Sequence, residues 1–184
     1  MSQKKKAKLS ERENRLLSRI LRVDQAGEYG ARRIYQGQRD VLKRRGGSKK
    51  TLEEIEHMAT QEEKHLSAFN DEIAARQTRP SALQPLWHVA GYALGAATAL
   101  LGEKAAHACT VAVEEVIEAH YARQEKELSA HPKLKAMVTR FRAEEKEHRE
   151  TALAAGAEET PGYGLLKKAI GAGSRVAIWL AERF

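Results

Sequence analysis

In this 184-residue chain, a Glu-x-x-His motif lies at Glu62 and His65, and another lies at Glu145 and His148. Residues three apart on a helix lie on one face, and each motif falls inside a stripe of apolar residues with helical spacing. Buried acids and histidines are unfavourable without compensating partners. One such motif is usually part of a solvated face, whereas two in apolar stripes indicate a metal site.

Two further helices supply acids that precede these motifs. Glu28 lies at the edge of an inner helix face before the first motif, and Glu114 lies on an apolar face before the second. Spacing alone leaves Glu115 and Glu118 as alternatives to Glu114. The order Glu, Glu-x-x-His, Glu, Glu-x-x-His is the pattern of di-iron and di-manganese carboxylate bundles. Because the two glutamates of each half are 34 and 31 positions apart, the halves form a pseudo-repeat.

These residue types suit a pair of divalent ions. Four carboxylates neutralise and bridge two ions and change their coordination as iron changes oxidation state, while each imidazole adds a nitrogen ligand. Tyr35 and Tyr121 follow Glu28 and Glu114 by seven residues, or two helical turns. We expect Tyr35 or Tyr121 to lie near the cluster, although core packing is the role that we expect first for each.

Gly27 and Gly30 flank Glu28, although a glycine inside a helix costs about 1 kcal/mol relative to alanine. We expect these glycines to let helices approach closely around a small cluster. A tight helix crossing without a metal is the alternative. Among the other residues that could bind metals, Cys109 is expected in the core, and four histidines are expected at the surface or at an interface: His57, His88, His107 and His131.

The composition favours an all-α fold, since charged residues make up 31% and aromatic residues 5% of the chain. Helical periodicity, ended by glycine and proline signals, predicts a single domain over 1–184, with helices at residues 10–44, 48–77, 86–129, 133–156 and 165–184. The third helix is expected to bend near Gly102. Residues 1–16 are expected to form a flexible basic tail.

The charge and the cysteine content limit the classes of partner and of site. The formal net charge of +7 suits anionic surfaces such as phospholipid or nucleic acid. The single cysteine excludes an internal disulfide framework and a cysteine-based zinc or iron–sulfur site. Lysines at the start are followed by no apolar targeting segment, so we expect a cytosolic chain in a reducing compartment.

Two segments indicate membrane association without spanning. The uncharged stretch 89–102 is shorter than the roughly 20 residues that cross a bilayer. Residues 165–184 form an amphipathic interfacial pattern: the residues of the apolar side are Leu165, Ala169, Ala172, Val176 and Leu180, and those of the polar side are Lys167, Lys168, Arg175 and Glu182. The expected membrane contacts are Trp87, Tyr92, Trp179 and Phe184. Packing of these faces on each other or on a second protomer is the alternative.

Longer segments carry a family resemblance that extends beyond the spacing of the acids and histidines. They are "RVDQAGEYGARRIYQGQ", "QEEKHLSAFN", "LQPLWHVAGYALGAATALLGEKAAHACTVAVEEVIEAHYARQ", "FRAEEKEHR" and "YGLLKKAIGAGSRVAIWLAERF". Together they extend over nearly all of residues 21–184. In these segments the chain resembles the demethoxyubiquinone hydroxylases of ubiquinone biosynthesis, which are ferritin-like di-iron monooxygenases.

The resemblance implies a ferritin-like four-helix bundle that binds two iron ions, with additional membrane-associating helices. It selects Glu114 over Glu115, so the implied ligands are Glu28, Glu62, His65, Glu114, Glu145 and His148. The implied reaction uses O₂ to hydroxylate the benzoquinone ring of a demethoxylated polyprenyl quinone. Reduced nicotinamide is the implied electron source, directly or through a partner, although the chain has no glycine fingerprint to hold one.

The expected partners are the quinone and a membrane surface, and other ubiquinone-biosynthesis proteins or a second copy of the chain could join them. The expected location is peripheral, on the cytoplasmic face of a bacterial inner membrane, with the matrix side of the mitochondrial inner membrane as the alternative. A ferritin-like ferroxidase could use the same ligands but needs no apolar entrance. A di-iron tRNA hydroxylase would suit the positive charge, yet the aromatic residues lie mainly on apolar faces rather than beside basic residues, so we expect no nucleic-acid partner. A metal-free membrane-binding bundle leaves the buried acids unexplained.

Overall fold

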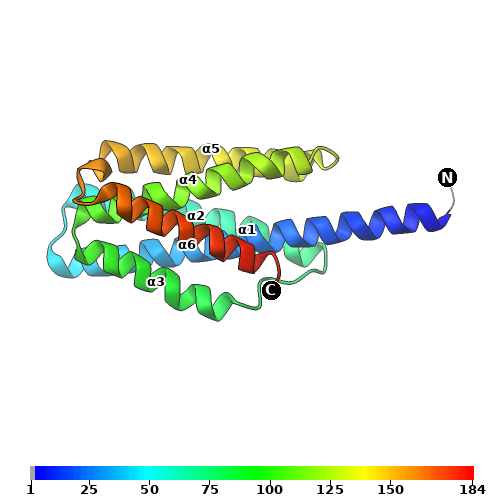
Figure 1. The fold of residues 1–184 in the computed structure, drawn as a ribbon, viewed down its shortest axis with the longest axis horizontal. Helices are drawn as coiled ribbons and strands as arrows, with labels where there is room; N and C mark the ends of the chain where they lie inside the picture. Colours follow the sequence, from blue (N-terminus) through cyan, green and yellow to red (C-terminus); the bar gives the residue numbers. More distant parts are fainter. Residues whose placement is uncertain (1–2) are drawn as a thin grey trace.

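The computed structural model describes residues 3–184, and this range contains helices and no strands. The all-α prediction is therefore confirmed for the described part of the chain (Figure 1). The α-helices are α1 (Gln3–Arg45), α2 (Lys49–Ala75), α3 (Gln84–Leu100), α4 (Glu103–Glu127), α5 (Pro132–Ala154) and α6 (Tyr163–Ala181), with a short 3₁₀ helix at Ala157–Glu159.

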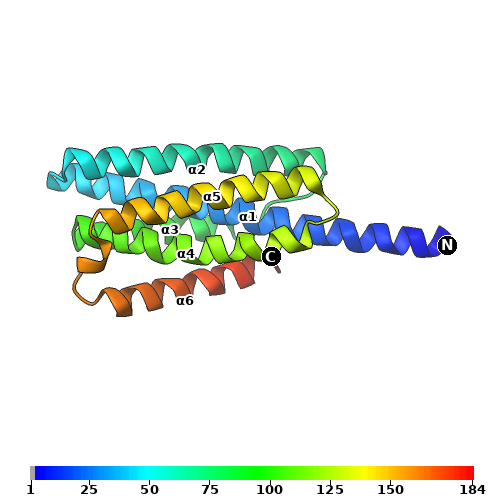
Figure 2. The same ribbon diagram turned by 90° about the horizontal axis from the view of Figure 1, so that it is seen from above.

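Four of the helices form a bundle, in which α1 pairs with α2 and α4 pairs with α5. The other two cover one side of it, α3 along α1 and α6 along α4 (Figures 1 and 2). The chain thus repeats one arrangement twice, because in each half the third helix returns along the first. The pseudo-repeat seen in the acidic residues extends to α3 and α6.

The beginning of the chain differs from the expected flexible tail. Helix α1 begins at Gln3, so nearly all of residues 1–16 are helical, and only the first two lie outside the described residues. The physical reason is composition: residues 3–16 are rich in Lys, Arg, Glu and Leu, which are good helix formers, and include neither glycine nor proline.

The expected third helix, residues 86–129, is two antiparallel helices rather than one bent helix (Figure 1). The chain reverses at Gly102, where φ is 118°. Side chains strongly disfavour this backbone conformation, whereas glycine adopts it readily. The reversal lays the apolar segment of α3 on α1 instead of extending it beyond the bundle.

Helix α3 crosses α1 at glycines, because backbone there meets backbone. A Cβ on Gly95 would collide with the carbonyl oxygen of Ile34, and one on Gly91 would lie 2.8 Å from the carbonyl oxygen of Gly30. By contrast, a Cβ on Gly27 or Gly30 would meet nothing within 4 Å. The expectation that Gly27 and Gly30 allow close helix contact around the acids is therefore wrong, since the close approach needs the glycines of α3 and Gly37 of α1, where a Cβ would collide with the backbone of α3.

The apolar core of the bundle is divided by a polar layer. One apolar cluster includes Leu21, Phe69 and Phe141, and another includes Tyr35 and Met58. On α1, α2 and α4, the buried acids and histidines lie at sequence positions between the two clusters. Packing on both sides holds these polar side chains at the centre of the bundle. Over the described residues, we find no helix with the length and apolar character needed to cross a membrane.

Candidate metal centre

All six acids and histidines implied by the resemblance meet at the centre of the bundle, and each is at most 1% exposed. Helices α1 and α4 contribute one glutamate each, and α2 and α5 contribute one Glu-x-x-His motif each. The side chains form two groups able to hold a metal ion, Glu28, Glu62, His65 and Glu145 in one and Glu62, Glu114, Glu145 and His148 in the other. Glu62 and Glu145 belong to both groups, as bridging carboxylates would.

The side-chain oxygen and nitrogen atoms of these six residues suit a pair of metal ions. Eight of them are buried and lack a hydrogen-bond partner within the described part of the chain: Glu28 Oε2, Glu62 Oε1 and Oε2, His65 Nδ1, Glu114 Oε2, Glu145 Oε1 and Oε2, and His148 Nδ1. Buried polar atoms are almost always paired in native proteins. Two divalent ions would satisfy all eight, with carboxylate and imidazole donors that iron and manganese accept.

Each histidine presents Nδ1 to the acids. His65 Nδ1 lies 3.3 Å from Glu28 Oε2 and 3.2 Å from Glu145 Oε1. His148 Nδ1 lies 3.2 Å from both Glu62 Oε1 and Glu145 Oε2. The rings are held by packing, since Phe141 stacks on His65 and the edge of Tyr35 meets His148.

Both tyrosines considered for a place near the cluster are buried there, and each donates a hydrogen bond across it. Tyr35 Oη on α1 donates to Glu114 Oε1 on α4 at 2.7 Å. Tyr121 Oη on α4 donates to Glu28 Oε1 on α1. Each tyrosine thus orients the single glutamate that the first helix of the other half contributes, Glu114 on α4 or Glu28 on α1. Burial, followed by the charge of the nearby glutamates, raises the pKa of both phenols well above 10, so both remain donors.

Without metal, the acids hold protons unequally. Burial and the charge of Glu145 raise the pKa of Glu62 and of Glu114 well above 4.5. Burial also opposes ionisation of Glu145, but contacts from His148 and His65 outweigh it and lower its pKa to about 2. Burial lowers the pKa of His65, yet the carboxylates of Glu145 and Glu28 raise it to about 11. Protons on these groups occupy the place of metal charge, so metal binding should release them.

The geometry separates Glu114 from the two alternatives that spacing left open. Glu115 is exposed and pairs with Lys167 at 2.7 Å, and Glu118 pairs with Arg149 at 3.1 Å. Both therefore face away from the central acids. Cys109 is fully buried, as predicted.

One histidine is placed differently from its prediction. His57 and His88 are exposed and His131 is half-buried, but His107 is only 1% exposed. It lies in a run of buried residues on α4 that includes the small side chains of Ala105, Ala106 and Ala108. The continuous run of small apolar residues around His107 is the signal that could have indicated its burial.

Two polar residues beside the motifs were missed by sequence reasoning. Gln61 and Glu144 each directly precede a glutamate of the cluster, and each contacts the outer nitrogen of a histidine. They are partly exposed, so the pattern of apolar residues gave no reason to single them out. Their position one residue before each Glu-x-x-His motif is the signal that could have found them.

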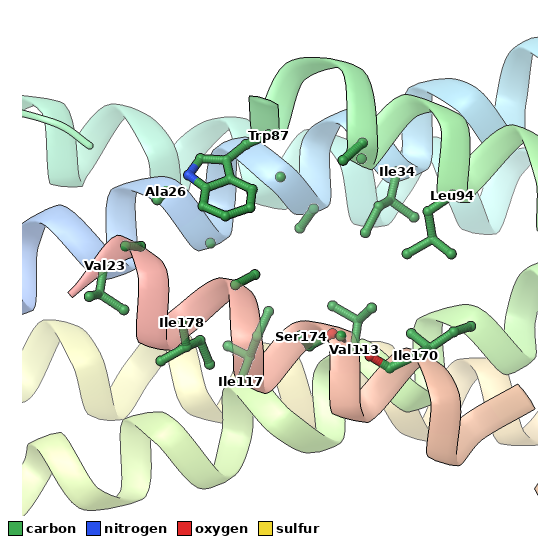
Figure 3. A pocket seen from close by; sticks show the side chains of 18 of the residues that line it. Val23, Ala26, Ile34, Trp87, Leu94, Val113, Ile117, Ile170, Ser174 and Ile178 are labelled. Atoms are coloured by element: carbon green, nitrogen blue, oxygen red, sulfur yellow. Dashed lines mark hydrogen bonds between the residues drawn. The ribbon is translucent and has the colours of Figure 1, made fainter. Parts of the chain in front are cut away.

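An apolar cavity of about 530 Å³ lies between α3 and α6 and over α1 and α4 (Figure 3). Gly27 and Ala31 of its lining flank Glu28 in the sequence, and Val113 precedes Glu114. Small residues from α1, α3 and α6 widen it, among them Gly30, Ala90, Gly173 and Ala177. Gly27 and Gly30 thus keep space open in this cavity.

The residues expected to contact a membrane divide into two groups. Trp179 and Phe184 are about half exposed, at 52% and 49%. Trp87 is half-buried and lines the cavity, and Tyr92 is half-buried with its hydroxyl donating to Asp40 Oδ2 at 3.2 Å. The strongly exposed apolar residues are others on the same two helices or at their ends: Leu86, Val89, Leu100, Leu101, Leu165 and Val176.

Comparison with known proteins gives consistent matches over most of the chain. The sequence model of the family described as "Ubiquinone biosynthesis protein COQ7" matches residues 15–181. The chain is 54% identical over 169 residues to the 3-demethoxyubiquinol 3-hydroxylase of Rhodospirillum rubrum, covering 91% of this chain and 78% of that protein. It is 49% identical over 173 residues to the mitochondrial NADPH-dependent 3-demethoxyubiquinone 3-hydroxylase of Mus musculus, with 91% and 78% covered. It is 38% identical over 191 residues to the mitochondrial 5-demethoxyubiquinone hydroxylase of Saccharomyces cerevisiae, with 95% and 81% covered.

Proposed function

The chain belongs to the family of the ubiquinone biosynthesis protein COQ7, and on that premise we propose that its central acids and histidines bind two iron ions for ring hydroxylation. It is a hydroxylase of ubiquinone biosynthesis, as its relatives are. The finer proposal is that the substrate is a demethoxylated polyprenyl quinone and that O₂ supplies the new oxygen. When bound, the iron pair would supply the redox chemistry that activates O₂.

The proposed ligands are Glu28 and His65 for one ion, Glu114 and His148 for the other, and Glu62 and Glu145 for both. This assignment is supported by the two groups of side chains and by their eight unpaired buried atoms. Reduced nicotinamide is the proposed electron source, either directly or through a partner. The name of the Mus musculus relative, which calls that protein NADPH-dependent, supports it.

The observation that carries the substrate proposal is the cavity between α3 and α6. Its lining is almost wholly apolar, and its volume falls within the range of pockets that enclose small organic molecules. A quinone ring placed there would lie against Gly27 and Val113, which directly precede Glu28 and Glu114 in the chain. A ferroxidase, which handles only iron and O₂, has no need of such a space.

The residues around the ring have separable tasks. Tyr35 and Tyr121 stay protonated and hold Glu114 and Glu28 in orientation through their hydrogen bonds. The apolar walls exclude water, which protects a reactive oxidant from side reactions. Ser174 also lines the cavity, but its hydroxyl donates to the carbonyl of Ile170 at 3.0 Å and so leaves the wall apolar in effect.

The exposed apolar residues support a peripheral membrane location. Val89 on α3 is 66% exposed, and Leu165 at the start of α6 is 77% exposed. These two helices border the cavity, so a quinone could pass from lipid into it while its tail remained in the bilayer. The membrane face that we propose is the cytoplasmic face of a bacterial inner membrane, and the matrix face in mitochondria is the alternative that the names of the mammalian relatives favour.

The test supplies iron-loaded protein with O₂, NADPH and a demethoxylated polyprenyl quinone in lipid vesicles. We expect a ring-hydroxylated product that contains one atom from ¹⁸O₂, and we expect Glu145→Ala to abolish it while the circular dichroism remains helical. Label that came only from water, or turnover without iron, would refute the proposal. Iron oxidation without quinone product would favour the ferroxidase instead.

A further inference from the structure

The outer nitrogens of the two central histidines have different partners. His148 Nε2 donates to Gln61 Oε1 at 2.8 Å, from α5 to α2. His65 Nε2 donates to Glu144 Oε2, from α2 to α5. In both halves the acceptor is the residue just before the glutamate of the opposite motif. The contacts therefore cross in a symmetric way, but one acceptor is a neutral amide and the other is a carboxylate.

The rest of the cluster is more evenly matched. Each half supplies one terminal glutamate that accepts a hydrogen bond from a tyrosine of the other half. Each half also supplies one glutamate shared by both groups and one histidine that presents Nδ1. The two halves thus differ in charge at the hydrogen-bond acceptors of the two histidine Nε2 atoms.

A carboxylate partner changes the donor strength of an imidazole, whereas an amide mainly fixes its orientation. A carboxylate draws the Nε2 proton toward itself, which makes Nδ1 a stronger metal ligand. The negative charge of Glu144 also favours a more positive ion nearby. Arg140 approaches Glu144 only at 3.9 Å and is 65% exposed, and such exposed ion pairs are weak.

We propose that Glu144 and Gln61 are positioning residues that make the two metal positions unequal, so that the position at His65 binds divalent ions more tightly and favours Fe³⁺ more strongly than the position at His148. The inference rests on the proposed metal role of the two histidines, but not on the identity of the organic substrate. It gives the two ions different roles within a nearly symmetric set of ligands.

The test is an anaerobic titration of metal-free protein with Co²⁺, followed by its visible absorption. We expect two separate binding steps in the wild type. Glu144→Gln should weaken the tighter step about tenfold or more, as loss of such outer partners generally does, and Gln61→Glu should strengthen the weaker step. Each single variant therefore brings the two steps together. The double variant should separate them again, with the preferred position exchanged.

The control is Glu147→Gln, an exposed acid on the same helix, which should leave both steps unchanged. As a second readout, the iron-loaded Glu144→Gln variant should show a rise in the lower of the two reduction potentials, and Gln61→Glu a fall in the higher. Equal weakening of both steps by Glu144→Gln, or a double variant that does not restore the separation, would overturn the inference. A wild type that binds no Co²⁺ would instead overturn the metal site itself.

Discussion

At Glu62, burial and the charges of Glu145 and Glu28 raise the pKa of the carboxyl well above 4.5. The folded state then holds a proton that the unfolded state releases as the pH rises above 4.5, so this group reduces stability at neutral pH. The same side chain offers two oxygens to both groups of the candidate metal centre. Glu62 is thus unfavourable in the metal-free fold and favourable once ions bind.

We predict that Glu62→Gln raises the melting temperature of the metal-free protein and lowers its iron content. The gain should be about 2–4 °C for each kcal/mol in a chain of this length. Wild type should gain stability on iron loading, since a ligand that binds only the native state stabilises it, and the variant should gain much less. Calorimetry with metal analysis measures both effects, and full iron content in the variant would show that Glu62 is not a ligand.

His107 predicts a loss of stability in mild acid. Burial, reinforced by the charge of Lys50, lowers its pKa from 6.5 to about 4, although Glu103 acts in the opposite direction. Between pH 6.5 and pH 4 the unfolded chain binds a proton that the folded chain does not, so stability falls as the pH falls. The contribution is on the order of 3 kcal/mol for such a shift.

Denaturant titrations of metal-free wild type and His107→Gln at pH 7 and pH 4.5 measure this contribution. The variant should lose less stability than the wild type over this interval. His57→Gln, which changes an exposed histidine, is the matched control and should behave like the wild type. Equal pH dependence in wild type and His107→Gln would show that His107 is not the responsible group.

Among the helices, the crossing of α3 over α1 leads to opposite predictions for two kinds of glycine. Gly95→Ala places a methyl group against the carbonyl oxygen of Ile34, so backbone must move. We expect a loss of about 1–3 kcal/mol or more in unfolding free energy, as for other overpacked sites. Urea denaturation measures it, and an unchanged midpoint would mean that α3 does not approach α1 this closely.

Gly30→Ala is the matched variant on α1, because its new methyl group enters open space at the cavity. Stability should be unchanged or should rise by up to about 1 kcal/mol, since alanine is the better helix former. Turnover of the quinone should fall, because the cavity becomes narrower. Lost stability together with unchanged turnover would contradict the assignment of Gly30 to the cavity wall.

Periodicity alone predicts α2, α5 and α6 closely and α1 at its end, because apolar stripes there end at clear glycine or proline signals. It did not separate α3 from α4, since residues 86–129 are continuously compatible with helix and only the conformation of Gly102 reverses the chain. The spacing of Gly91 and Gly95 indicates a close helix crossing, but the segment of α1 that these glycines contact is evident only from the structure.

The acids of the candidate site were predictable for a similar reason. Glu62 and Glu145 replace apolar residues in buried stripes, so their types conflict with their positions. Gln61 and Glu144 create no such conflict, because they are polar residues at partly exposed positions. Which histidine each would contact depends on how α2 and α5 face each other, and no single stripe contains that information.

For the whole molecule, the large exposed apolar residues lie on α3 and α6 or at their ends, and these two helices border the cavity. Basic residues accompany them on α6, where Lys168 and Arg175 are exposed. With the net charge of +7, this surface suits a bilayer that contains anionic lipid. A second protomer covering the same surface is the competing arrangement.

We predict that Val89→Glu and Val176→Glu each lower the fraction of protein that floats with phosphatidylcholine–phosphatidylglycerol vesicles. Removing a buried valine from lipid costs about 1.5 kcal/mol or more, which is about a tenfold loss in partitioning. The control is Ser67→Glu, an exposed site on α2, which lies on the other side of the bundle from α6 (Figure 2). Unchanged flotation with a shift from dimer to monomer in light scattering would favour the second protomer.

The volume of the cavity limits which part of the substrate the enzyme can recognise. About 530 Å³ accommodates a substituted ring and the first part of an isoprenoid chain, but not a tail of many units. This cavity therefore cannot discriminate between tails of different length, and substrate selectivity must come from contacts with the head group. Quinones with three or ten isoprene units, compared at equal mole fraction in the bilayer, should turn over at similar rates, and a strong dependence on length would reveal a tail site elsewhere on the surface.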